Sequence, residues 1–386
     1  MRTPHAHAVV HLDAVAHNTA LFAAGTKAAV MAVVKADGFG HGAVPVASAA
    51  LSSGATWLGV TTCAEALQLR AGGITAPILS WMHSPLEDFG PALLADVDLS
   101  VSARAHLRAV AASAARLGVT AEVHLKADTG LHRNGARPEE WRELVRLARD
   151  LETTGHVRVR GVWSHLVSGT EAAEDTTRSQ VGLFDRAVQV ARGAGLRPEI
   201  RHLANSAATL GAPRTHYELV RPGIGLYGVE PEPRHVFGLR GAMTLSARLI
   251  LVKRVPAGSG ISYEHDYVTD RDTTLALVPL GYADGLPWAA ARHAEVSIAG
   301  RRHPVAGRIA MDQFVVDLGD VARHATPRIG DEAVLFGPGT EGEPTVADWA
   351  RWANTIPHEI ITGIGPRVAR HYVHTGALRT EELSRG

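Results

Sequence analysis

Short apolar runs alternate with longer amphipathic stretches over the first 237 residues. In residues 136–152, Trp141, Leu144 and Leu151 recur at helical spacing among Arg and Glu, which predicts a helix with one buried face. The apolar runs carry little charge, as the strands of a buried parallel sheet do. We predict eight such strands, at residues 30–34, 57–60, 77–80, 97–100, 121–126, 157–163, 199–203 and near 224–227. Eight βα units predict an α/β fold, a closed (β/α)8 or TIM barrel.

The pattern changes near residues 230–233, where the sequence reads Glu-Pro-Glu-Pro. Alternating strands separated by Pro and Gly turns follow, which predicts a C-terminal mainly-β domain. These strands are expected at residues 243–255, 274–279, 294–298, 303–305, 313–318 and 332–336. We therefore divide the chain into a strand at residues 1–11 that joins the β domain, a barrel at 12–237 and the β domain at 238–386.

The composition favours small-molecule chemistry. The chain has 386 residues, 46% of them hydrophobic, and its 39 Lys and Arg balance its 39 Asp and Glu. Such a balance provides no electrostatic attraction to nucleic acid or to an anionic membrane. No apolar run approaches the length of a membrane span, and the first residues lack the apolar core of a signal peptide. The single cysteine excludes an internal disulfide and fits a reducing compartment, so we expect a cytoplasmic protein.

Lys35 ends an apolar strand and is followed by a glycine-rich turn at residues 36–42. The carboxyl ends of the strands are where α/β barrels keep their chemistry, so this lysine would emerge at the barrel mouth. A lysine that carries a cofactor covalently would sit there. A lysine that only ends a strand in solvent is the alternative interpretation.

Further segments carry polar residues of the kinds that an amino-acid site needs, and the first three of them follow predicted strands. They are Lys126 with Arg133, Ser164-His165, Asn205-Ser206, Arg221-Pro222-Gly223-Ile224, Ser262-Tyr263 and Met311-Asp312. A serine that caps a helix amino terminus and glycine N–H groups late in a barrel both suit phosphate. Each segment also has a structural interpretation: an N-cap for Ser206, a tight turn for Gly223, and a core histidine for His165 or His202.

Together and in this order, these motifs resemble those of the alanine racemases. That family comprises fold-type III pyridoxal-phosphate enzymes with an amino-terminal barrel and a carboxyl-terminal β domain. The resemblance covers nearly the whole chain. It rests on Val-Val-Lys-Ala-Asp-Gly-x-Gly-His-Gly at 33–42, Leu-Lys-Ala-Asp-Thr-Gly at 125–130, His-x-Ala-Asn-Ser-Ala-Ala-Thr-Leu at 202–210, Gly-Tyr-Ala-Asp-Gly at 281–285 and Met-Asp-Gln at 311–313.

The resemblance implies a two-base amino-acid racemase, an isomerase. Lys35 would hold pyridoxal 5'-phosphate covalently and act as the base on one face of the substrate Cα, and Tyr263 would be the base on the other. In the family this tyrosine comes from the partner subunit, so a homodimer with shared sites is implied, in which the β domain lends Tyr263 and Met311 to the partner. A free phenol keeps its proton near neutral pH, and we expect His165 and Arg221 to supply the positive charge that Tyr263 needs.

The resemblance also implies the other site residues. Arg221 would face the pyridine nitrogen, with His202 as its support, and Ser206 with the N–H groups of Gly223 and Ile224 would hold the phosphate. The whole cofactor-binding set is Lys35, Phe39, His165, His202, Asn205, Ser206, Arg221, Gly223, Ile224 and His358. Arg133 and the backbone N–H of Met311 would bind the substrate carboxylate. Lys126, whose counterpart in the family is often carbamylated, and Asp312 would support them.

Several departures from the family concentrate at the site. Phe39 and His358 stand where the family has tyrosines, and we expect His358 to compensate as a cation. Glu264 and His265, next to Tyr263, could contact a longer or cationic substrate side chain. The other departures are Leu166-Val167-Ser168-Gly169 after His165, together with His132, Ala310 and Gly363.

Three functions stay open. The first is racemisation of alanine, with D-alanine feeding peptidoglycan. The second is another reaction of this scaffold, namely racemisation of a different amino acid, or decarboxylation, aldol cleavage or epimerisation in a biosynthetic pathway. The third is a non-catalytic cofactor carrier, against which the β half with Tyr263 and Met311 argues. Despite 21 histidines we expect no metal site, because their spacing matches no metal motif, and we expect neither nucleic acid nor membrane as a partner.

Overall fold

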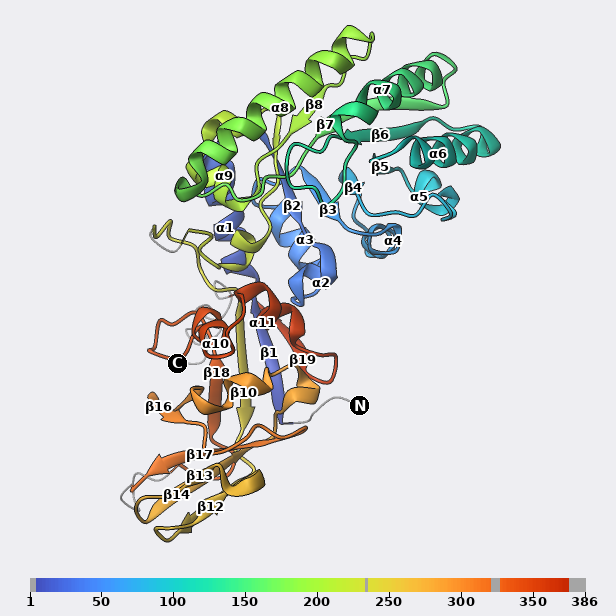
Figure 1. Ribbon diagram of the computed structural model, residues 1–386. Coiled ribbons are helices and arrows are strands. Elements are labelled where there is room, and N and C mark those ends of the chain that lie inside the picture. The colour runs from blue at the N-terminus through green and yellow to red at the C-terminus, as the bar shows by residue number, and fades with distance from the viewer. Residues whose placement is uncertain (1–4, 233–234, 321–326, 375–386) are drawn as a thin grey trace, which may run out of the picture.

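The computed structural model describes residues 5–232, 235–320 and 327–374. Residues 1–4 and 375–386, which begin and end the predicted β part, lie outside this description. An amino-terminal barrel stands above a mainly-β half, and the first strand of the chain runs within the lower half (Figure 1).

The barrel is the predicted closed ring of eight parallel strands. Most side chains of its strands are buried, as runs that carry little charge and have both faces covered should be. The strands are β2 (Ala29–Val33), β3 (Trp57–Val60), β4 (Ile78–Ser80), β5 (Val97–Val101), β6 (Ala121–Lys126), β7 (Val157–Trp163), β8 (Ile200–His202) and β9 (Leu219–Val220). Seven of these match the predicted strands within two residues at each end.

The predicted eighth strand is wrong. Residues Ile224–Tyr227 form a 3-10 helix, η3, and the barrel closes one step earlier through β9, which pairs with β2. The strand ends at Val220 because Pro222 has no N–H with which to continue a ladder. The backbone N–H groups of Gly223 and Gly225 instead donate to the hydroxyl of Ser206, at 2.8 and 3.3 Å.

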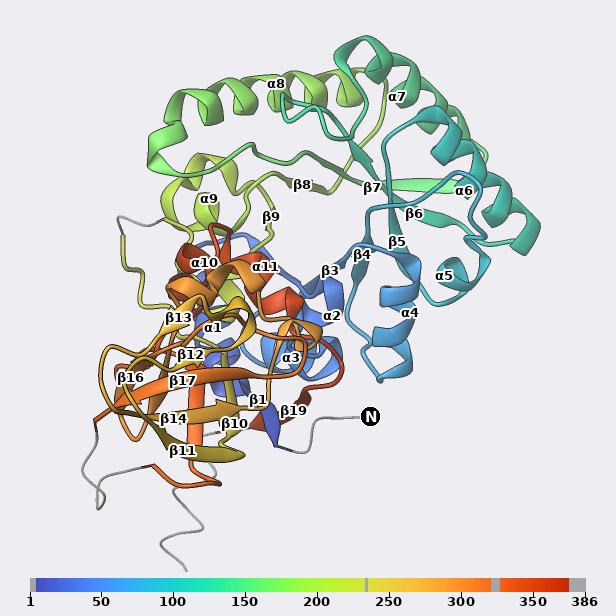
Figure 2. The same ribbon diagram turned by 60° about the horizontal axis from the view of Figure 1, so that its bottom comes forward.

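Helices α4 to α8 surround the outside of the barrel (Figure 2). The helices of this half are α1 (Leu12–Ala24), α2 (Lys35–Phe39), α3 (Ala43–Leu51), α4 (Cys63–Ala71), α5 (Gly90–Leu94), α6 (Arg104–Leu117), α7 (Pro138–Thr153), α8 (Glu174–Gly193) and α9 (Ser206–Gly211), with η1 (Glu171–Ala173) and η2 (Pro213–Thr215). Helix α7 buries Trp141, Leu144 and Val145 on one face, as its periodicity predicts.

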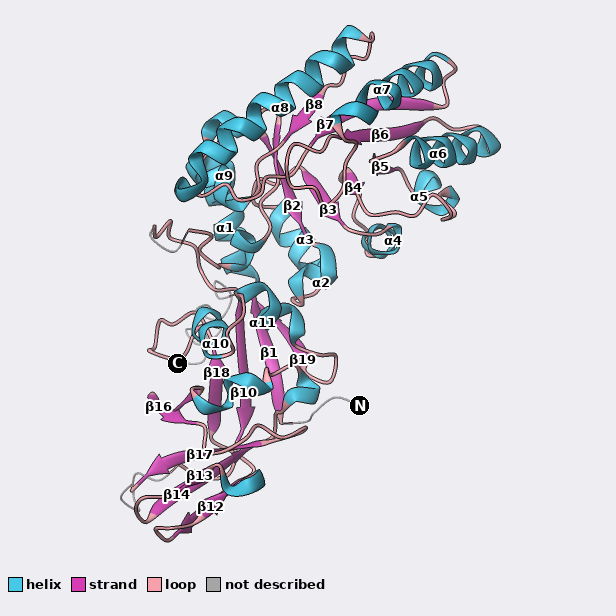
Figure 3. Cartoon of the chain, viewed as in Figure 1, coloured by secondary structure: helices cyan, strands magenta, loops and turns pink. Residues whose placement is uncertain are grey.

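The lower half contains three sheets (Figure 3). The first has the order β16 (Arg301–Pro304), β15 (Glu295–Ile298), β18 (Glu332–Phe336), β10 (Met243–Arg248), β1 (Ala6–His11) and β19 (Ala369–Val373); the second has β11 (Leu251–Val255), β14 (Thr273–Val278) and β17 (Phe314–Gly319); the third has β12 (Gly260–Ile261) and β13 (Tyr267–Val268). Short helical segments join them: η4 (Tyr263–His265), η5 (Tyr282–Asp284), η6 (Trp288–Arg292), α10 (Val346–Trp352) and α11 (Pro357–Gly363).

The strand predicted at residues 243–255 is in fact two strands that belong to different sheets. The N–H of Leu249 donates to the carbonyl of Asp331, beside the first sheet, whereas the next N–H, of Ile250, donates to Leu277 in the second. The chain therefore crosses from one sheet to the other between these two residues. The apolar pattern continues through this point, so the sequence does not show where the chain changes sheets.

The segment α2, which begins at Lys35, is a left-handed turn. Ala36 and Asp37 both have φ 52° and ψ 50°, and Phe39 also has φ 52°. This region costs non-glycine residues roughly 1–2 kcal/mol each. Hydrogen bonds hold the turn, among them one from the N–H of Ala43 to the Asp37 carboxylate at 2.8 Å.

The same turn joins the two halves of the molecule. The Arg370 guanidinium of β19 donates to the carbonyl of Gly40 at 3.0 Å. Gly40 has φ 80°, and a Cβ placed on it would lie 2.5 Å from the carbonyl oxygen of Ile361 in α11. Contact this close requires glycine. The barrel mouth and the lower half therefore have a fixed junction beside Lys35.

None of the helices in the described ranges combines the length and hydropathy that spanning a bilayer requires.

We predict that Gly40→Ala destabilises the protein more than Gly73→Ala does. Gly73 also has positive φ, 85°, but has no atom within 4 Å of a Cβ, so its substitution should cost only the backbone strain of roughly 1–2 kcal/mol. The clash with Ile361 should add about 1–3 kcal/mol at Gly40. Urea unfolding of both variants measures the difference, and equal losses would contradict a tight junction.

A second prediction concerns His41, which is fully buried after the turn and bonds through Nδ1 to the carbonyl of Phe39 at 2.9 Å. Burial lowers the pKa of His41 from 6.5 to about 4. The folded protein thus keeps this ring neutral while the unfolded chain takes up a proton below pH 6.5, so stability is lost as pH falls from 6.5 to about 4. Between about pH 7 and pH 5, the free energy of unfolding of His41→Gln should fall by about 2 kcal/mol less than that of the parent. Unfolding free energies against pH test this, with substitution of the exposed His293 by Gln as the control.

Candidate active site

Five of the predicted site residues meet at the carboxyl ends of the barrel strands. Lys126 and His202 are the last residues of β6 and β8, and Lys35, His165 and Arg221 lie one or two residues beyond β2, β7 and β9. Parallel strands of a barrel end on one face, which explains why residues far apart in sequence converge here.

Arg221 is buried, at 4% exposure. Its guanidinium donates to the carbonyls of Ser164 and Leu203 at 2.8 and 3.1 Å, and to ring nitrogens of His165 and His202 at 3.3 and 3.2 Å. Burial lowers the pKa of Arg221 to about 9, so the group stays charged at neutral pH. The barrel mouth therefore contains a buried cation held by neutral acceptors.

The expectation that His165 adds positive charge is wrong. Burial, followed by the charges of Arg221, Lys126, Arg133 and Lys35, holds the pKa of His165 well below 6.5. Four cations from different barrel segments surround one imidazole, so the ring stays neutral at physiological pH. The positive charge at this point comes from Arg221.

Trp163, the last residue of β7, forms a platform under these groups, and our sequence interpretation gave it no role. His202 stacks on its ring at 5.3 Å, Lys126 Nζ lies 4.1 Å from the ring centre, and the Arg221 guanidinium lies 4.9 Å away. The indole N–H donates to the Ser100 hydroxyl at 2.9 Å, which fixes the plane of the ring. The available signal was its position directly before Ser164-His165.

A chain of hydrogen bonds continues from Arg221 into the barrel core. Because arginine only donates, His202 accepts at Nδ1 and donates through Nε2 to Nδ1 of His124, at 2.8 Å. His124 then donates through Nε2 to the Asp98 carboxylate at 3.0 Å, which also accepts from Arg160 at 3.3 Å. Burial and the Arg221 charge hold the pKa of His202 well below 6.5, consistent with a neutral ring in this chain.

Lys35 is half-buried beside the left-handed turn. Burial lowers the pKa of Lys35, the charge of Arg133 lowers it further, and Glu65 partly opposes both. Glu65 also accepts from the N–H of Ala36 at 2.8 Å, next to Lys35. Glu65 was missed from the sequence because it reads as an ordinary capping residue of α4, a role it also has.

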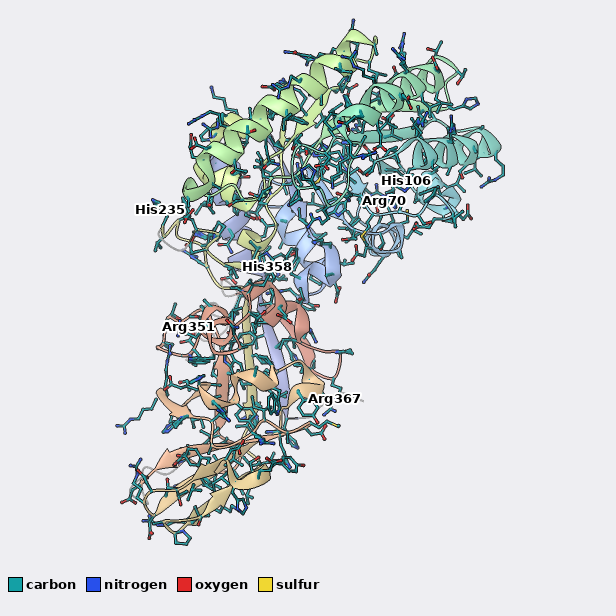
Figure 4. The ribbon with its side chains drawn as sticks, in the orientation of Figure 1. Arg70, His106, His235, Arg351, His358 and Arg367 are labelled. Atoms are coloured by element: carbon teal, nitrogen blue, oxygen red, sulfur yellow. The ribbon has the colours of Figure 1, made fainter. Side chains whose placement is uncertain are left out.

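Phe39, His358 and Gly223 come together around Lys35. Lys35 Nζ lies 5.8 Å from the Phe39 ring centre, the Phe39 and His358 rings are 6.1 Å apart, and a Cβ on Gly223 would lie 3.4 Å from the Phe39 ring. Figure 4 labels His358 where α11 approaches the barrel. Partial burial and the Lys35 charge both lower the pKa of the His358 ring below its usual value, which disfavours the expected cation.

The cap of α9 differs from the prediction. Asn205, not Ser206, is the N-cap, and its side-chain oxygen accepts from the N–H of Ala208 at 3.0 Å. The Ser206 hydroxyl turns inward and accepts from Gly223, while the buried Ile224 follows in η3. The predicted phosphate-binding groups thus contact one another.

Lys126 is buried at 3% exposure and donates to the side-chain oxygen of Asn134. Burial, then the charges of Arg221 and Arg133, lowers the pKa of Lys126 to about 7. A large fraction of this amine is therefore neutral at physiological pH.

Tyr263, Met311 and Asp312 lie in the lower half. The segments β12 and β13 that flank Tyr263 are at the end of the molecule away from the barrel, and Tyr263 is 67% exposed (Figure 1). Met311 accepts through its carbonyl from the N–H of Ala283 at 2.9 Å, and Asp312 pairs with Arg367 at 2.8 Å. Arg367 also pairs with Asp284, so Met311 and Asp312 are held by the 281–285 motif. The structure does not bring Tyr263 to Lys35 within one chain.

Comparison with known proteins covers both halves. Residues 10–231 match the alanine racemase N-terminal domain family and residues 242–372 the C-terminal domain family. The chain is 53% identical over 371 residues to an alanine racemase of Frankia casuarinae, covering 95% of this chain and 96% of that one. It is 51% identical over 376 residues to an alanine racemase of Thermobifida fusca, covering 97% and 99%.

The fold agrees with a solved structure as well. The alanine racemase from Streptomyces coelicolor superimposes with a TM-score of 0.93 at 49% identity, over 96% of this chain and 98% of that one. The match spans the barrel and the mainly-β half, which a single-barrel cofactor carrier would lack. The chain belongs to the alanine racemase family.

Proposed function

We propose that this protein is a pyridoxal-phosphate-dependent alanine racemase that works as a homodimer with two shared active sites. One observation carries the proposal. Lys35 and the buried Arg221 meet at the barrel mouth, while Tyr263 of the same chain is exposed at the end of the molecule away from the barrel. A second subunit is the simplest source of the missing phenol. A cytoplasmic location stays a prediction.

The residues at the barrel mouth fit the cofactor. The Ser206 hydroxyl and the N–H of Ile224 would donate to a phosphate, and the N–H of Gly223 would join them on leaving its bond to Ser206. The absent side chain of Gly223 leaves room beside Phe39. Lys35 provides the amine for covalent attachment. When bound, pyridoxal phosphate withdraws electrons from the substrate Cα and so acidifies its proton. Arg221 would donate to the pyridine nitrogen and keep it unprotonated.

Lys35 would move the proton on one face of Cα. Burial and the charge of Arg133 already lower its pKa, which favours the neutral amine that a base must be. Arg133, exposed at the mouth, would bind the substrate carboxylate together with the partner's Met311. The neutral His165 would accept a hydrogen bond from Arg221 and leave the charge on the guanidinium.

Tyr263 of the partner subunit would move the proton on the other face. The surface around Tyr263 has the character of an interface. Trp288 is 55% exposed and lies 6.0 Å from the Arg308 guanidinium, which pairs with Glu264 and Asp266 on either side of His265. Exposed aromatic groups of this kind mark contact surfaces.

Incubation of the purified holoenzyme with L- or D-amino acids in D₂O tests the activity. Proton NMR follows Cα deuteration, and chiral chromatography follows inversion. Alanine should be deuterated and racemised. Turnover of another amino acid would indicate a racemase of different substrate. Loss of CO₂ or of the side chain would indicate decarboxylation or aldol cleavage in place of racemisation. Cofactor absorbance without exchange would indicate a carrier.

We predict that Lys35→Ala and Tyr263→Phe complement each other. Each variant alone should lack one base and lose racemisation. In a co-refolded equimolar mixture half of the dimers are mixed, and each mixed dimer has one intact site, so roughly a quarter of the parent activity should return. Tyr217→Phe, which removes a phenol bonded to Asp185 outside the site, should keep parent activity.

Activity no greater than the sum of the two variants would contradict shared sites without contradicting racemisation. Size-exclusion chromatography of the mixture confirms that mixed dimers can form.

Lys126 has the environment of a carbamylated lysine. A neutral amine adds CO₂ to give a carbamate and a proton, and the pKa of about 7 makes the neutral form abundant. The change replaces a cation by an anion between Arg133 and Arg221. The group at residue 126 then attracts both guanidinium groups, which the ammonium repels. Asn134 would then rotate its amide to donate an N–H to the new group. The carbamate would hold Arg133 in place for the substrate.

We predict that carbon-13 bicarbonate labels Lys126. Carbon-13 NMR of the labelled protein should show a carbamate signal that Lys126→Arg abolishes and that Lys253→Arg, at an exposed lysine, retains. Circular dichroism checks that both variants fold. A signal that persists in Lys126→Arg, or is absent from the parent, would contradict the assignment.

A further inference from the structure

A cluster of metal-ligating side chains lies outside the site already described. Cys63 is the first residue of α4, and His83 and Glu87 come from the loop between β4 and α5. One ligand atom from each lies within 4.8 Å of the other two, and in the described part of the chain this is the one group with that property. Cys63 Sγ is 3.6 Å from His83 Nδ1, which is 3.9 Å from Glu87 Oε2.

His83 is held in the orientation of a metal ligand. Its side chain is 2% exposed, and its ring packs edge-on against Phe89 at 5.6 Å. Nε2 lies 3.0 Å from the carbonyl oxygen of Ser80, which can only accept, so the proton is on Nε2. The lone pair of Nδ1 therefore points at Cys63 and Glu87. Histidine ligands of metals usually have this second hydrogen bond, which fixes the tautomer.

We propose that Cys63, His83 and Glu87 bind a divalent zinc ion. A thiolate, an imidazole and a carboxylate are the ligands that zinc takes in proteins. Tetrahedral zinc, with bonds of about 2.0–2.3 Å, places its ligand atoms about 3.3–3.7 Å apart, so small side-chain rotations would complete the geometry.

The fourth position has a candidate in His106, in the first turn of α6. It interacts electrostatically with both Glu87 and His83, and it lies on the α4–α6 side of the barrel with Arg70 (Figure 4). A water molecule is the alternative fourth ligand. Structural zinc sites usually have four protein ligands, which favours His106, but three protein ligands and a water also complete the coordination of zinc.

A reactive thiol is a weaker interpretation of Cys63. Burial, followed by the charge of Glu87, raises the pKa of this thiol to about 11, so the metal-free thiol is a poor nucleophile. Glu87, whose charge disfavours the free thiolate, would share the cation with it.

Zinc at this position would stabilise the segment that holds Glu65 next to Lys35. Cys63 is two residues before Glu65, whose carboxylate accepts from the N–H groups of Ala36, Thr61 and Thr62 at 2.8, 2.7 and 3.1 Å. The ion would bind the start of α4 to the loop after β4, and would thereby stiffen the rim beside the left-handed turn. The role is structural, and the ion takes no part in the racemisation proposed above.

The single cysteine makes the site directly measurable, because every thiol signal comes from Cys63. Untagged holoenzyme is freed of metal by a chelator and titrated with zinc sulfate, while a disulfide reagent measures the thiol reaction rate. About one equivalent of zinc should slow the reaction at least about tenfold, and metal analysis should find about one zinc per chain. Cys63→Ser should lose the bound zinc.

Glu87→Gln tests the carboxylate at an exposed residue, where substitution leaves the fold intact. Loss of an outer-shell partner alone weakens metal binding about tenfold to a hundredfold, so loss of this direct ligand should weaken zinc protection of the thiol at least about tenfold. Asp88→Asn, which removes the neighbouring exposed carboxylate, should bind as the parent does. Unchanged thiol reactivity in saturating zinc, or equal protection in Glu87→Gln and Asp88→Asn, would overturn the proposal. Circular dichroism and cofactor absorbance confirm that each variant is folded.

Discussion

The barrel mouth is organised around one buried positive charge, the guanidinium of Arg221. No hydrogen bond described for it goes to a carboxylate; its partners are two carbonyls and two imidazoles. The charge contributes to lowering the pKa of Lys126, His165 and His202, so it sets the protonation of the groups around it. Because Arg221 donates to His202, each later hydrogen bond of the chain, to His124 and then to Asp98, is donated in the same direction. Removal of one member would leave buried polar groups unpaired, which is strongly destabilising.

Most of the fold could be predicted because apolar runs that carry little charge pack as buried strands between amphipathic helices. The failures have local causes. The strand Leu219–Val220 is too short to form a pattern, whereas the apolar 3-10 turn at Ile224–Tyr227 resembles a strand. The cap of α9 was misassigned because Asn205 and Ser206 are both good N-caps, and only the fold decides which side chain faces Gly223.

Site residues could be predicted where the residue type and its motif indicate the role. They could not be predicted where the role or the protonation state depends on neighbours from other segments. Lys35, Lys126 and Arg221 follow from motifs at strand ends. The neutrality of His165 depends on four cations from separate segments, which no local pattern contains. Asp98 and Trp163 were missed for the same reason, since each acts through contacts across the barrel. The Cys63 cluster was missed because Cys63 lies 20 and 24 residues before His83 and Glu87 and meets them only when successive loops fold together.

Strand β1 has an inner place in the six-stranded sheet, between β10 and β19. Its partners are far along the chain: His11 bonds to Thr244, 233 residues later, and β19 ends at Val373. At about 5–20 residues per second on the ribosome, β1 waits about 10–50 s for β10 and longer for β19. The barrel strands are complete by Val220, so the barrel can close while β1 is still unpaired. The first strand to be synthesised is thus among the last to find both its neighbours.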